Sequence, residues 1–275
     1  MKTSGTWPIG VCSWSLQQDI AGTAEAMKTL GLNHVHLDIS PACQDDPDAY
    51  LEQVRRQGWT ISSTMIGFPQ EDYSTLETIK KTGGIVPDDC WETNRQRFLK
   101  AIHATAALKV PYLSSHFGFL DTTSPAYART FYDRIRQVAD AAAEHAVVLL
   151  METGQEQAGE LADFLETLAH PAVGVNFDPA NMILYNMGDP ADGVRMLAPW
   201  VRHIHIKDAV RTAVPGTWGQ EVVWGTGQVN ARNFLNTLHE IGYNGVLSIE
   251  REAGDDRLGD IQQAVAQLTA FSANG

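Results

Sequence analysis

A short alternating run, Val201–Lys207, reads V-R-H-I-H-I-K. Because successive side chains of a strand point to opposite faces, this run places His203, His205 and Lys207 on one face. Three polar side chains on one face of an otherwise apolar strand must contact other polar groups, since burial without partners is costly. The run therefore predicts a strand that looks into a polar site.

Three further apolar runs end in a carboxylate, and each has the length of a buried strand. They are Val147–Met151 before Glu152, Val173–Phe177 before Asp178, and Val246–Ile249 before Glu250. Together with the histidine run, four strand-like segments finish in Glu, Asp, His and Glu, in that order along the chain. This repetition predicts four chemically active side chains at equivalent positions of one sheet.

These runs belong to an alternation of strands and helices that extends along the whole chain. The predicted strands are Ile9–Trp14, His34–Ile39, Thr60–Ile66, Pro111–His116, Val147–Glu152, Val173–Asp178, Val201–Lys207 and Gly245–Glu250. The predicted helices are Thr23–Leu30, Asp46–Gln57, Asn94–Leu108, an amphipathic helix that begins at Ser124–Pro125, Glu160–Leu168, Pro190–Leu197, Asn230–Ile241 and Asp260–Phe271. Eight such units without an internal linker indicate an α/β fold, a single (β/α)8 TIM barrel domain over residues 1–275. An open doubly wound sheet is the alternative, but no G-x-G-x-x-G follows the first strand.

Composition limits the class of protein. The 275 residues are 44% hydrophobic and 19% charged, which supports a large core rather than disorder. The formal net charge of −13 argues against a nucleic-acid partner, which would require clustered Lys and Arg. Three cysteines without C-x-x-C spacing predict neither a disulfide framework nor a structural zinc site. No signal peptide or membrane span is recognised, so we expect a cytoplasmic protein without a membrane partner, unless an export signal has been removed.

Two stretches are typical of loops that cover a binding site. Gly67–Asp89 is long, polar and rich in turn residues, as lids and binding loops often are. Gly216–Gly227, after the seventh strand, is rich in Gly and Trp and is predicted to close over the same site. The sequence indicates no oligomer interface, although barrels of this kind often form dimers or tetramers.

The carboxyl ends of the strands of a closed parallel barrel line one mouth. Glu152, Asp178, His205 and Glu250 are therefore expected to meet there. Three carboxylates in one pocket repel each other unless a cation lies among them. This oxygen-rich set with one imidazole suits one divalent ion, Mn²⁺, Mg²⁺, Co²⁺ or Zn²⁺. The alternative is that each carboxylate only caps a following helix, and four equivalent positions argue against it.

Four motifs carry a family resemblance. They are M-E-T-G-Q-E (Met151–Glu156), N-F-D-P-A-N (Asn176–Asn181), H-I-H-I-K-D (His203–Asp208) and S-I-E (Ser248–Glu250). With G-V-C-S-W-S-L near the start and S-I-E-R-E near the end, the chain resembles the sugar phosphate isomerase/epimerase superfamily over its whole length. The resemblance implies a xylose-isomerase-like barrel with a metal site. That superfamily includes ketose 3-epimerases, hydroxypyruvate isomerases, inosose-processing enzymes and type IV endonucleases.

The resemblance also implies roles for individual residues. The four strand-end residues correspond to the metal ligands, and Glu152 and Glu250 resemble the acid/base pair that acts on opposite faces of a bound sugar. Glu156 and Arg211 lie at the offsets where the epimerases place substrate-contacting residues. Asn181 stands three residues after the aspartate, where ketose epimerases and endonucleases carry a histidine. This departure weakens the expectation of a ketohexose epimerase and of a multi-metal nuclease.

The ligand set predicts carbonyl chemistry. A divalent ion that chelates a carbonyl oxygen and its neighbouring hydroxyl stabilises the enediolate formed when a carbon-bound proton leaves. Return of the proton gives epimerisation or isomerisation, and loss of a β-hydroxyl gives dehydration.

We therefore expect an isomerase or epimerase of a small carbohydrate substrate: a sugar, polyol ketone or keto-acid. It should be unphosphorylated, because the loop Arg251–Asp256 after the last strand is acidic. An inosose-type dehydratase is the alternative. A type IV-like endonuclease and a non-catalytic sugar-binding barrel are more distant ones.

Further substrate-binding residues are predicted around the mouth. His116 ends the fourth strand, and Asn181 follows the sixth. Lys207 is expected either to polarise a substrate oxygen or to form an ion pair with Glu250 or Asp178. The aromatic residues that could pack against a sugar ring are Trp14, Phe68, Trp218 and Trp224. His36 and Asp38, at the second strand, are candidate pocket residues. His203 lies one pleat deeper than His205 on the same face and either supports that residue or is packed core.

Overall fold

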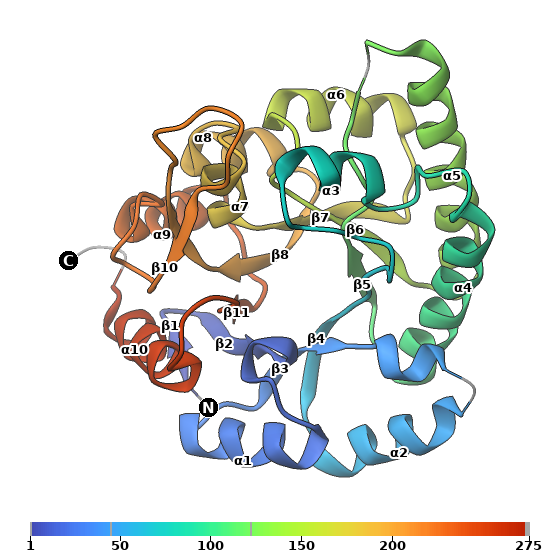
Figure 1. Ribbon diagram of the computed structural model, residues 1–275. Helices are drawn as coiled ribbons and strands as arrows, with labels where there is room; N and C mark the ends of the chain where they lie inside the picture. Colours follow the sequence, from blue (N-terminus) through green and yellow to red (C-terminus); the bar gives the residue numbers. More distant parts are fainter. Residues whose placement is uncertain (1, 45, 122, 273–275) are drawn as a thin grey trace.

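Eight parallel strands close into a barrel in the computed structural model, which describes residues 2–44, 46–121 and 123–272 (Figure 1). Around the barrel they are β2 (Trp7–Cys12), β3 (His34–Asp38), β4 (Thr60–Met65), β5 (Tyr112–Ser115), β6 (Val148–Glu152), β7 (Val173–Phe177), β8 (Val201–Ile206) and β11 (Leu247–Ile249). The ring closes where β11 pairs with β2, with Leu247 opposite Ile9. The predicted (β/α)8 TIM barrel is therefore confirmed.

Helices surround the ring of strands (Figure 1). They are α1 (Ile20–Leu30), α2 (Pro47–Gln57), α3 (Leu76–Thr82), α4 (Trp91–Ala107), α5 (Pro125–Glu144), α6 (Ala158–Leu168), α7 (Pro179–Leu184), α8 (Pro190–Leu197), α9 (Ala231–Glu240) and α10 (Arg257–Ala270). Short 3-10 turns cover Ser13–Leu16 and Ser40–Cys43. In the described part of the chain, none of these helices combines the length and apolar character that crossing a bilayer requires.

Two predicted boundaries of secondary-structure elements were wrong near the start of the chain, one of a helix and one of a strand. Helix α1 begins three residues before the predicted Thr23, because the Asp19 carboxylate accepts a hydrogen bond from the backbone N–H of Gly22 at 2.8 Å. The first predicted strand ends at Cys12 instead of Trp14, and the chain turns there into the 3-10 segment. This turn brings Trp14 to the mouth of the barrel.

The interior of the barrel is polar, whereas the apolar core lies between the strands and the helices. His203 is buried inside the ring, with its Nδ1 atom 2.9 Å from the Asn176 side-chain oxygen. Its Nε2 atom lies 3.0 Å from the Ser62 hydroxyl and 3.1 Å from the Ser248 hydroxyl. These contacts confirm that the polar face of Val201–Lys207 looks inward and finds polar partners, as burial requires.

The stretch Gly67–Asp89 is an ordered, hydrogen-bonded segment, which we call the wall, rather than an open loop. It contains α3, which the sequence did not indicate. The Glu71 carboxylate accepts hydrogen bonds from the backbone N–H of Phe68 and of Gly84, each at 3.0 Å. The Asn94 amide, from α4, donates to the Gly84 carbonyl at 2.9 Å. This segment is thereby fixed beside the carboxyl end of β5.

The loop after β8 is also anchored. It contains a small antiparallel pair, β9 (Asp208–Val210) with β10 (Gln220–Val222). The Asp208 carboxylate accepts hydrogen bonds from the backbone N–H groups of Gly225, Gly227 and Val229, at 2.9–3.0 Å. One buried side chain therefore determines the path of the whole loop.

Gly84→Ala tests how tightly the wall is attached. Gly84 has φ of +66°, and a Cβ atom there would lie 2.1 Å from the backbone of Phe117. We expect the free energy of unfolding to fall by more than about 3 kcal/mol, measured by denaturant titration.

Gly216→Ala is the matched control. Its φ is +78°, but a Cβ atom there would meet nothing within 4 Å. It should cost only roughly 1 kcal/mol, the strain of a left-handed alanine. Equal losses in the two variants would contradict the close packing of Gly84 against Phe117.

Candidate metal centre

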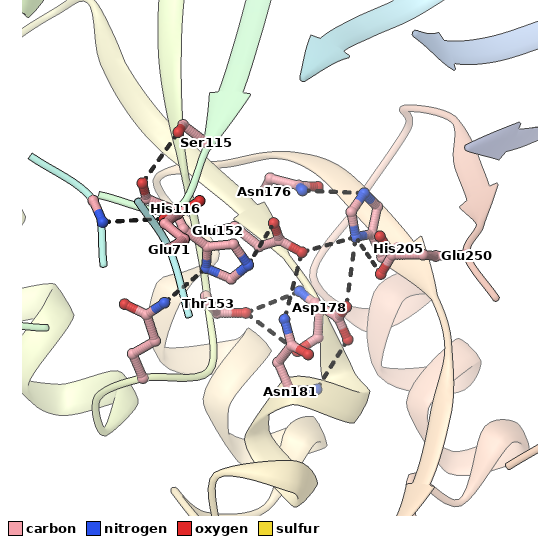
Figure 2. A network of polar contacts seen from close by, with 12 residues as sticks. Glu71, Ser115, His116, Glu152, Thr153, Asn176, Asp178, Asn181, His205 and Glu250 are labelled. Carbon is pink, nitrogen blue, oxygen red and sulfur yellow. Dashed lines mark hydrogen bonds and ion pairs between the residues drawn. The ribbon is translucent and has the colours of Figure 1, made fainter. Parts of the chain in front are cut away.

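Four side chains from consecutive strands of the barrel converge at its mouth (Figure 2). Glu152, Asp178, His205 and Glu250 each offer one ligand atom, and these four atoms lie within 4.8 Å of one another. The Nδ1 atom of His205 is 3.1 Å from Glu152 Oε1, 3.5 Å from Asp178 Oδ2 and 3.3 Å from Glu250 Oε2. The structure thus brings together the four residues that the strand ends predicted.

Asp178 combines two functions, one for each oxygen. Its Oδ1 atom accepts hydrogen bonds from the backbone N–H of Ala180 and of Asn181, at 2.8 and 3.0 Å, and so caps the N-terminus of α7. Its Oδ2 atom faces His205. The helix-capping role that the sequence offered as an alternative is therefore present, but it uses only one of the two carboxylate oxygens.

The donor set fits a divalent cation. Glu152 Oε2, Asp178 Oδ2 and His205 Nδ1 are buried and have no hydrogen-bond partner among the described residues. Buried polar atoms without partners are rare in proteins and commonly mark a place for a water or an ion. Three carboxylates with one imidazole are suitable ligands for Mg²⁺, Mn²⁺, Co²⁺ or Zn²⁺. Glu152, Asp178, His205 and Glu250 would hold such an ion.

Neighbouring basic side chains lower the pKa values of the three carboxylates. Burial raises the pKa of Asp178, but Lys207 and His205 outweigh burial and hold it below its ordinary value. The same balance of burial against Lys207 and His205 lowers the pKa of Glu250. Glu152 is also buried, and His116 and His205 lower its pKa. All three carboxylates are therefore ionised at neutral pH, as metal ligands must be.

His205 is the positive partner of the cluster when protonated. Burial lowers its pKa, but Glu250 and the other carboxylates raise it well above the ordinary value. A cation at this position would therefore compete with a proton for the Nδ1 atom, so metal affinity should fall as pH falls.

Two interior residues orient the imidazole of His205 from behind. Its Nε2 atom lies 3.0 Å from Nδ1 of His36 and 3.2 Å from the side-chain amide of Asn176. Burial lowers the pKa of His36 well below the ordinary value, so that ring stays neutral and its Nδ1 atom can accept a hydrogen bond from Nε2–H of His205. This contact keeps Nδ1 of His205 facing the carboxylates, where it carries a proton or, once that proton is lost, has a lone pair for a metal ion. His203 lies deeper and holds Asn176.

Two residues of the cluster, Glu152 and Glu250, line a cavity of about 610 Å³. The predicted substrate-binding residues His116, Asn181, Lys207 and Trp14 line this cavity. The Nε2 atom of His116 is 3.3 Å from Glu152 Oε2, and the Asn181 amide donates to Glu152 Oε1 at 3.4 Å. Trp14 donates its indole N–H to Glu250 Oε1 at 2.7 Å. Each glutamate thus has one oxygen at the cluster and one held from outside it.

Lys207 forms an ion pair, one of the two roles expected from its position. Its ammonium nitrogen lies 2.8 Å from Glu250 Oε2, 2.6 Å from Glu252 Oε2 and 3.7 Å from Asp178 Oδ2. Burial lowers the pKa of Lys207, but these carboxylates raise it well above the ordinary value. The lysine remains charged and compensates the negative charge of the carboxylates together with His205.

Four other expected pocket residues lie elsewhere. Glu156 and Arg211 are not among the described residues that line the cavity, so the structure does not support their predicted contact with substrate. Arg211 donates instead to the Asn186 side chain at 2.8 Å and to the Gly188 carbonyl. Glu156 is buried near Glu160 at the start of α6. Phe68 and Trp224 are core residues.

The structure adds pocket residues that sequence reasoning missed. Tyr73, Tyr185 and Glu71 line the cavity, together with the predicted Trp218. Tyr73 and Glu71 belong to the segment before α3, and Tyr185 ends α7, so none follows a strand directly. Strand-end position was the signal used, and it cannot identify residues that loops bring back over the mouth.

Comparisons with known proteins agree with the barrel. A family model described as xylose isomerase-like TIM barrel matches residues 23–271. The chain is similar to the structure of a xylose isomerase domain protein from Planctomyces limnophilus, with 31% identity and a TM-score of 0.85 over 96% of this chain and 95% of that chain.

Two more distant structures share the fold. A xylose isomerase-like TIM barrel protein from Mycobacterium smegmatis, in complex with magnesium, is 19% identical, with a TM-score of 0.72 and 98% of both chains covered. D-psicose 3-epimerase from Clostridium cellulolyticum H10, with D-tagatose, is 17% identical, with a TM-score of 0.71 and 100% of both chains covered.

One curated relative matches over a short stretch. Over 82 residues the chain is 32% identical to the 3-dehydroshikimate dehydratase of Bacillus anthracis. The match covers 28% of this chain and 29% of that protein, so it spans less than a third of either. The neighbours whose names state an activity are thus enzymes, an epimerase and a dehydratase.

Asp178→Asn tests the metal centre. The amide oxygen can still cap α7, but the charge at the second oxygen is lost. We expect the affinity for Mn²⁺ to fall by roughly 100-fold or more, measured by calorimetric titration of protein first treated with EDTA.

Asp189→Asn is the matched control. The Asp189 carboxylate caps α8 in the same way, with hydrogen bonds from the backbone N–H of Ala191 and Asp192 at 2.9 and 3.1 Å. Its affinity for Mn²⁺ should equal that of the wild type. A similar loss in both variants would show that the effect comes from the cap and not from a metal ligand.

Glu156→Gln should change how stability depends on pH. Burial, with a contribution from Glu160, raises the pKa of Glu156 from 4.5 to about 8 in the folded chain. The folded state therefore binds this proton more tightly, and its stability falls as pH rises from 4.5 through 8. We expect the variant to be more stable than the wild type at pH 9, by on the order of 3 kcal/mol, and equally stable at pH 4.5.

Denaturant titrations at both pH values measure this difference. Glu166→Gln, at an exposed position of the same helix α6, should leave the pH dependence unchanged. If the free energy of unfolding of the wild type and of Glu156→Gln changed with pH in parallel, the raised pKa of the buried Glu156 carboxyl would be refuted.

Proposed function

This chain belongs to the xylose isomerase-like TIM barrel family, and we propose that it is a divalent-metal-dependent isomerase or epimerase of a small, unphosphorylated carbohydrate. The observation that carries the proposal is the arrangement of the two glutamates at the metal centre. Glu152 and Glu250 belong to strands that β7 and β8 separate, so they reach the cavity from two sides. Each is buried, ionised and held in position.

The four ligands suit an ion that would, when bound, polarise a substrate carbonyl and offset negative charge as the neighbouring carbon loses a proton. Glu152 and Glu250 are the groups that accept and return that proton. The His116 imidazole, 3.3 Å from Glu152 Oε2, lies where it can exchange a proton with that glutamate. The Trp14 and Lys207 contacts hold Glu250 in one orientation.

The product of the reaction depends on the carbon, and on the face of that carbon, to which a proton is returned. Return of the proton to the opposite face of the same carbon inverts that carbon, and this requires a second group on the other side of the substrate. Return to the adjacent carbon moves the carbonyl. Two carboxylates on different sides of one cavity support inversion as readily as isomerisation.

Dehydration is the second candidate. The stretch shared with the 3-dehydroshikimate dehydratase supports it. In that reaction the same proton abstraction is followed by loss of a hydroxyl group from the β-carbon, and His116 or Asn181 would face the leaving oxygen from the wall of the cavity. A conjugated carbonyl product with new ultraviolet absorption would favour this candidate.

Proton exchange with solvent tests the proposal directly. Metal-loaded protein in D₂O is mixed with a panel of ketoses, inososes and hydroxypyruvate and followed by proton NMR. We expect deuterium to appear next to the carbonyl of at least one compound. Absence of exchange from every member, with metal binding confirmed, would overturn the proposal.

Glu250→Gln, measured at a Mn²⁺ concentration high enough to saturate its weakened site, should abolish exchange. We expect a loss of at least about 100-fold in the exchange rate, because the amide cannot accept the proton. The control is Glu240→Gln, an exposed glutamate on α9 that pairs with Arg195, and it should exchange at the wild-type rate. Full turnover by metal-loaded Glu250→Gln would remove this residue from the mechanism.

A further inference from the structure

The cavity is lined by more residues than those of the metal centre. Tyr73, Leu184, Tyr185 and Trp218 also line it, and we call these four residues the distal subsite. These residues come from the segment before α3, from the end of α7 and from the loop between β9 and β10. Nothing in the proposed proton transfer uses them.

The distal subsite is continuous with the catalytic side of the cavity. The Tyr73 ring lies 6.0 Å from the His116 ring, centroid to centroid, and His116 touches Glu152. The Trp218 indole N–H donates to the Tyr73 carbonyl at 3.1 Å. The Trp218 ring is 4.7 Å from the Tyr185 ring in an edge-to-face arrangement. A ligand bound at the metal centre can therefore extend along an aromatic surface.

The aromatic surface is held in place from behind. Tyr185 packs with Ile79 of α3 and Phe119 in a small apolar cluster of their own, against which Trp218 and Leu184 also lie. The Glu71 hydrogen bonds fix the segment that carries Tyr73. Preorganised aromatic side chains bind a ring at low cost in conformational entropy.

The charges of the cavity exclude anionic ligands. Asp38, Glu71, Glu221 and Glu252 line it in addition to the catalytic glutamates. Its one lysine, Lys207, already pairs with Glu250 and Glu252, and no arginine is among the described lining residues. The nearby Arg251 is engaged by Glu221 and Asp260. Away from the metal ligands, a phosphate or carboxylate would be repelled by these carboxylates and would meet no unpaired lysine or arginine among the described lining residues.

The size of the cavity exceeds that of a single sugar. Cavities of roughly 300–1,000 Å³ hold drug-sized ligands, whereas a hexose has only roughly 12 non-hydrogen atoms. The cavity, of about 610 Å³, has room for a second ring.

We propose that the distal subsite binds an uncharged ring attached to the reacting sugar, so that the substrate is a neutral glycoside rather than a free monosaccharide, a sugar phosphate or a sugar acid. The reacting sugar, whose carbonyl must be a ring ketone because the glycosidic bond occupies its anomeric carbon, lies at the four ligands. The attached ring packs on Trp218 and Tyr73. This inference rests on the proposed function for the orientation of the ligand, and on the aromatic and acidic lining for its chemical class.

Equilibrium binding tests the subsite without requiring turnover. Mn²⁺-loaded protein is titrated by calorimetry with p-nitrophenyl and methyl glycosides of glucose, galactose, mannose and xylose, in both anomers. We expect at least one p-nitrophenyl glycoside to bind 10-fold or more tightly than its methyl counterpart. The matching p-nitrophenyl glycuronide, which adds one carboxylate, should bind at least 10-fold more weakly than the neutral glycoside.

Variants of Trp218 locate the effect. Trp218→Ala should remove the preference for the p-nitrophenyl glycoside and leave Mn²⁺ affinity and methyl glycoside affinity unchanged. Trp218→Phe, which keeps an aromatic face but loses the hydrogen bond to Tyr73, should retain most of the preference. Val214→Ala is the control, because Val214 is exposed on the same loop and does not line the cavity.

The results separate the subsite from the proposed function. Equal affinity for p-nitrophenyl and methyl glycosides, or no binding by any member of the panel, would overturn the subsite even if free ketoses exchange deuterium. Loss of both affinities by the same factor in Trp218→Ala would also overturn it. An aryl preference without deuterium exchange would support the subsite and overturn only the proton-transfer function.

Discussion

Three buried carboxylates around one imidazole impose the constraint on which the rest of the site depends. Ionised carboxylates inside a protein are costly unless positive charge lies close to them. Here the compensation comes from two sides, from His205 within 3.5 Å of all three and from Lys207 beside Glu250 and Asp178. Even so, two polar atoms that face each other in the cluster, Asp178 Oδ2 and His205 Nδ1, have no hydrogen-bond partner among the described residues. The arrangement is one that a divalent cation completes.

The polar interior of the barrel follows from the same constraint. An imidazole that is to bind a metal must present one nitrogen and keep its ring orientation, and neighbouring groups usually fix that orientation. His36 and Asn176 contact its far nitrogen, and His203 in turn holds Asn176 between the strands. The serine hydroxyls around His203 satisfy its remaining nitrogen. Interior positions that an ordinary barrel fills with branched apolar side chains are here occupied by a hydrogen-bonded support for one ligand.

At the mouth of the barrel, the residues suited to proton transfer and the residues suited to substrate recognition come from different parts of the chain. The strand ends carry the groups that can move a proton, and they are rigid because each belongs to the sheet. The wall opposite them comes from loops, yet these loops are also fixed, by Glu71 on one side and by Asp208 on the other. A preformed wall of aromatic and acidic side chains favours neutral ligands with a flat face. Substrate choice and catalysis can therefore change independently in this architecture.

The amino-acid sequence by itself determined the barrel and the ligand set, because both depend on short-range regularities. Alternation within Val201–Lys207 sets which side chains face inward, and the carboxyl ends of parallel strands must share one mouth. Only the tertiary structure decided the wall of the cavity. Offsets from strand ends predicted Glu156 and Arg211 at the substrate, but neither is among the described residues that line the cavity. Tyr73 and Tyr185 line it from segments without a strand-end signal. The path of a loop depends on long-range contacts such as those of Asp208 and Gly84, and no local pattern encodes them.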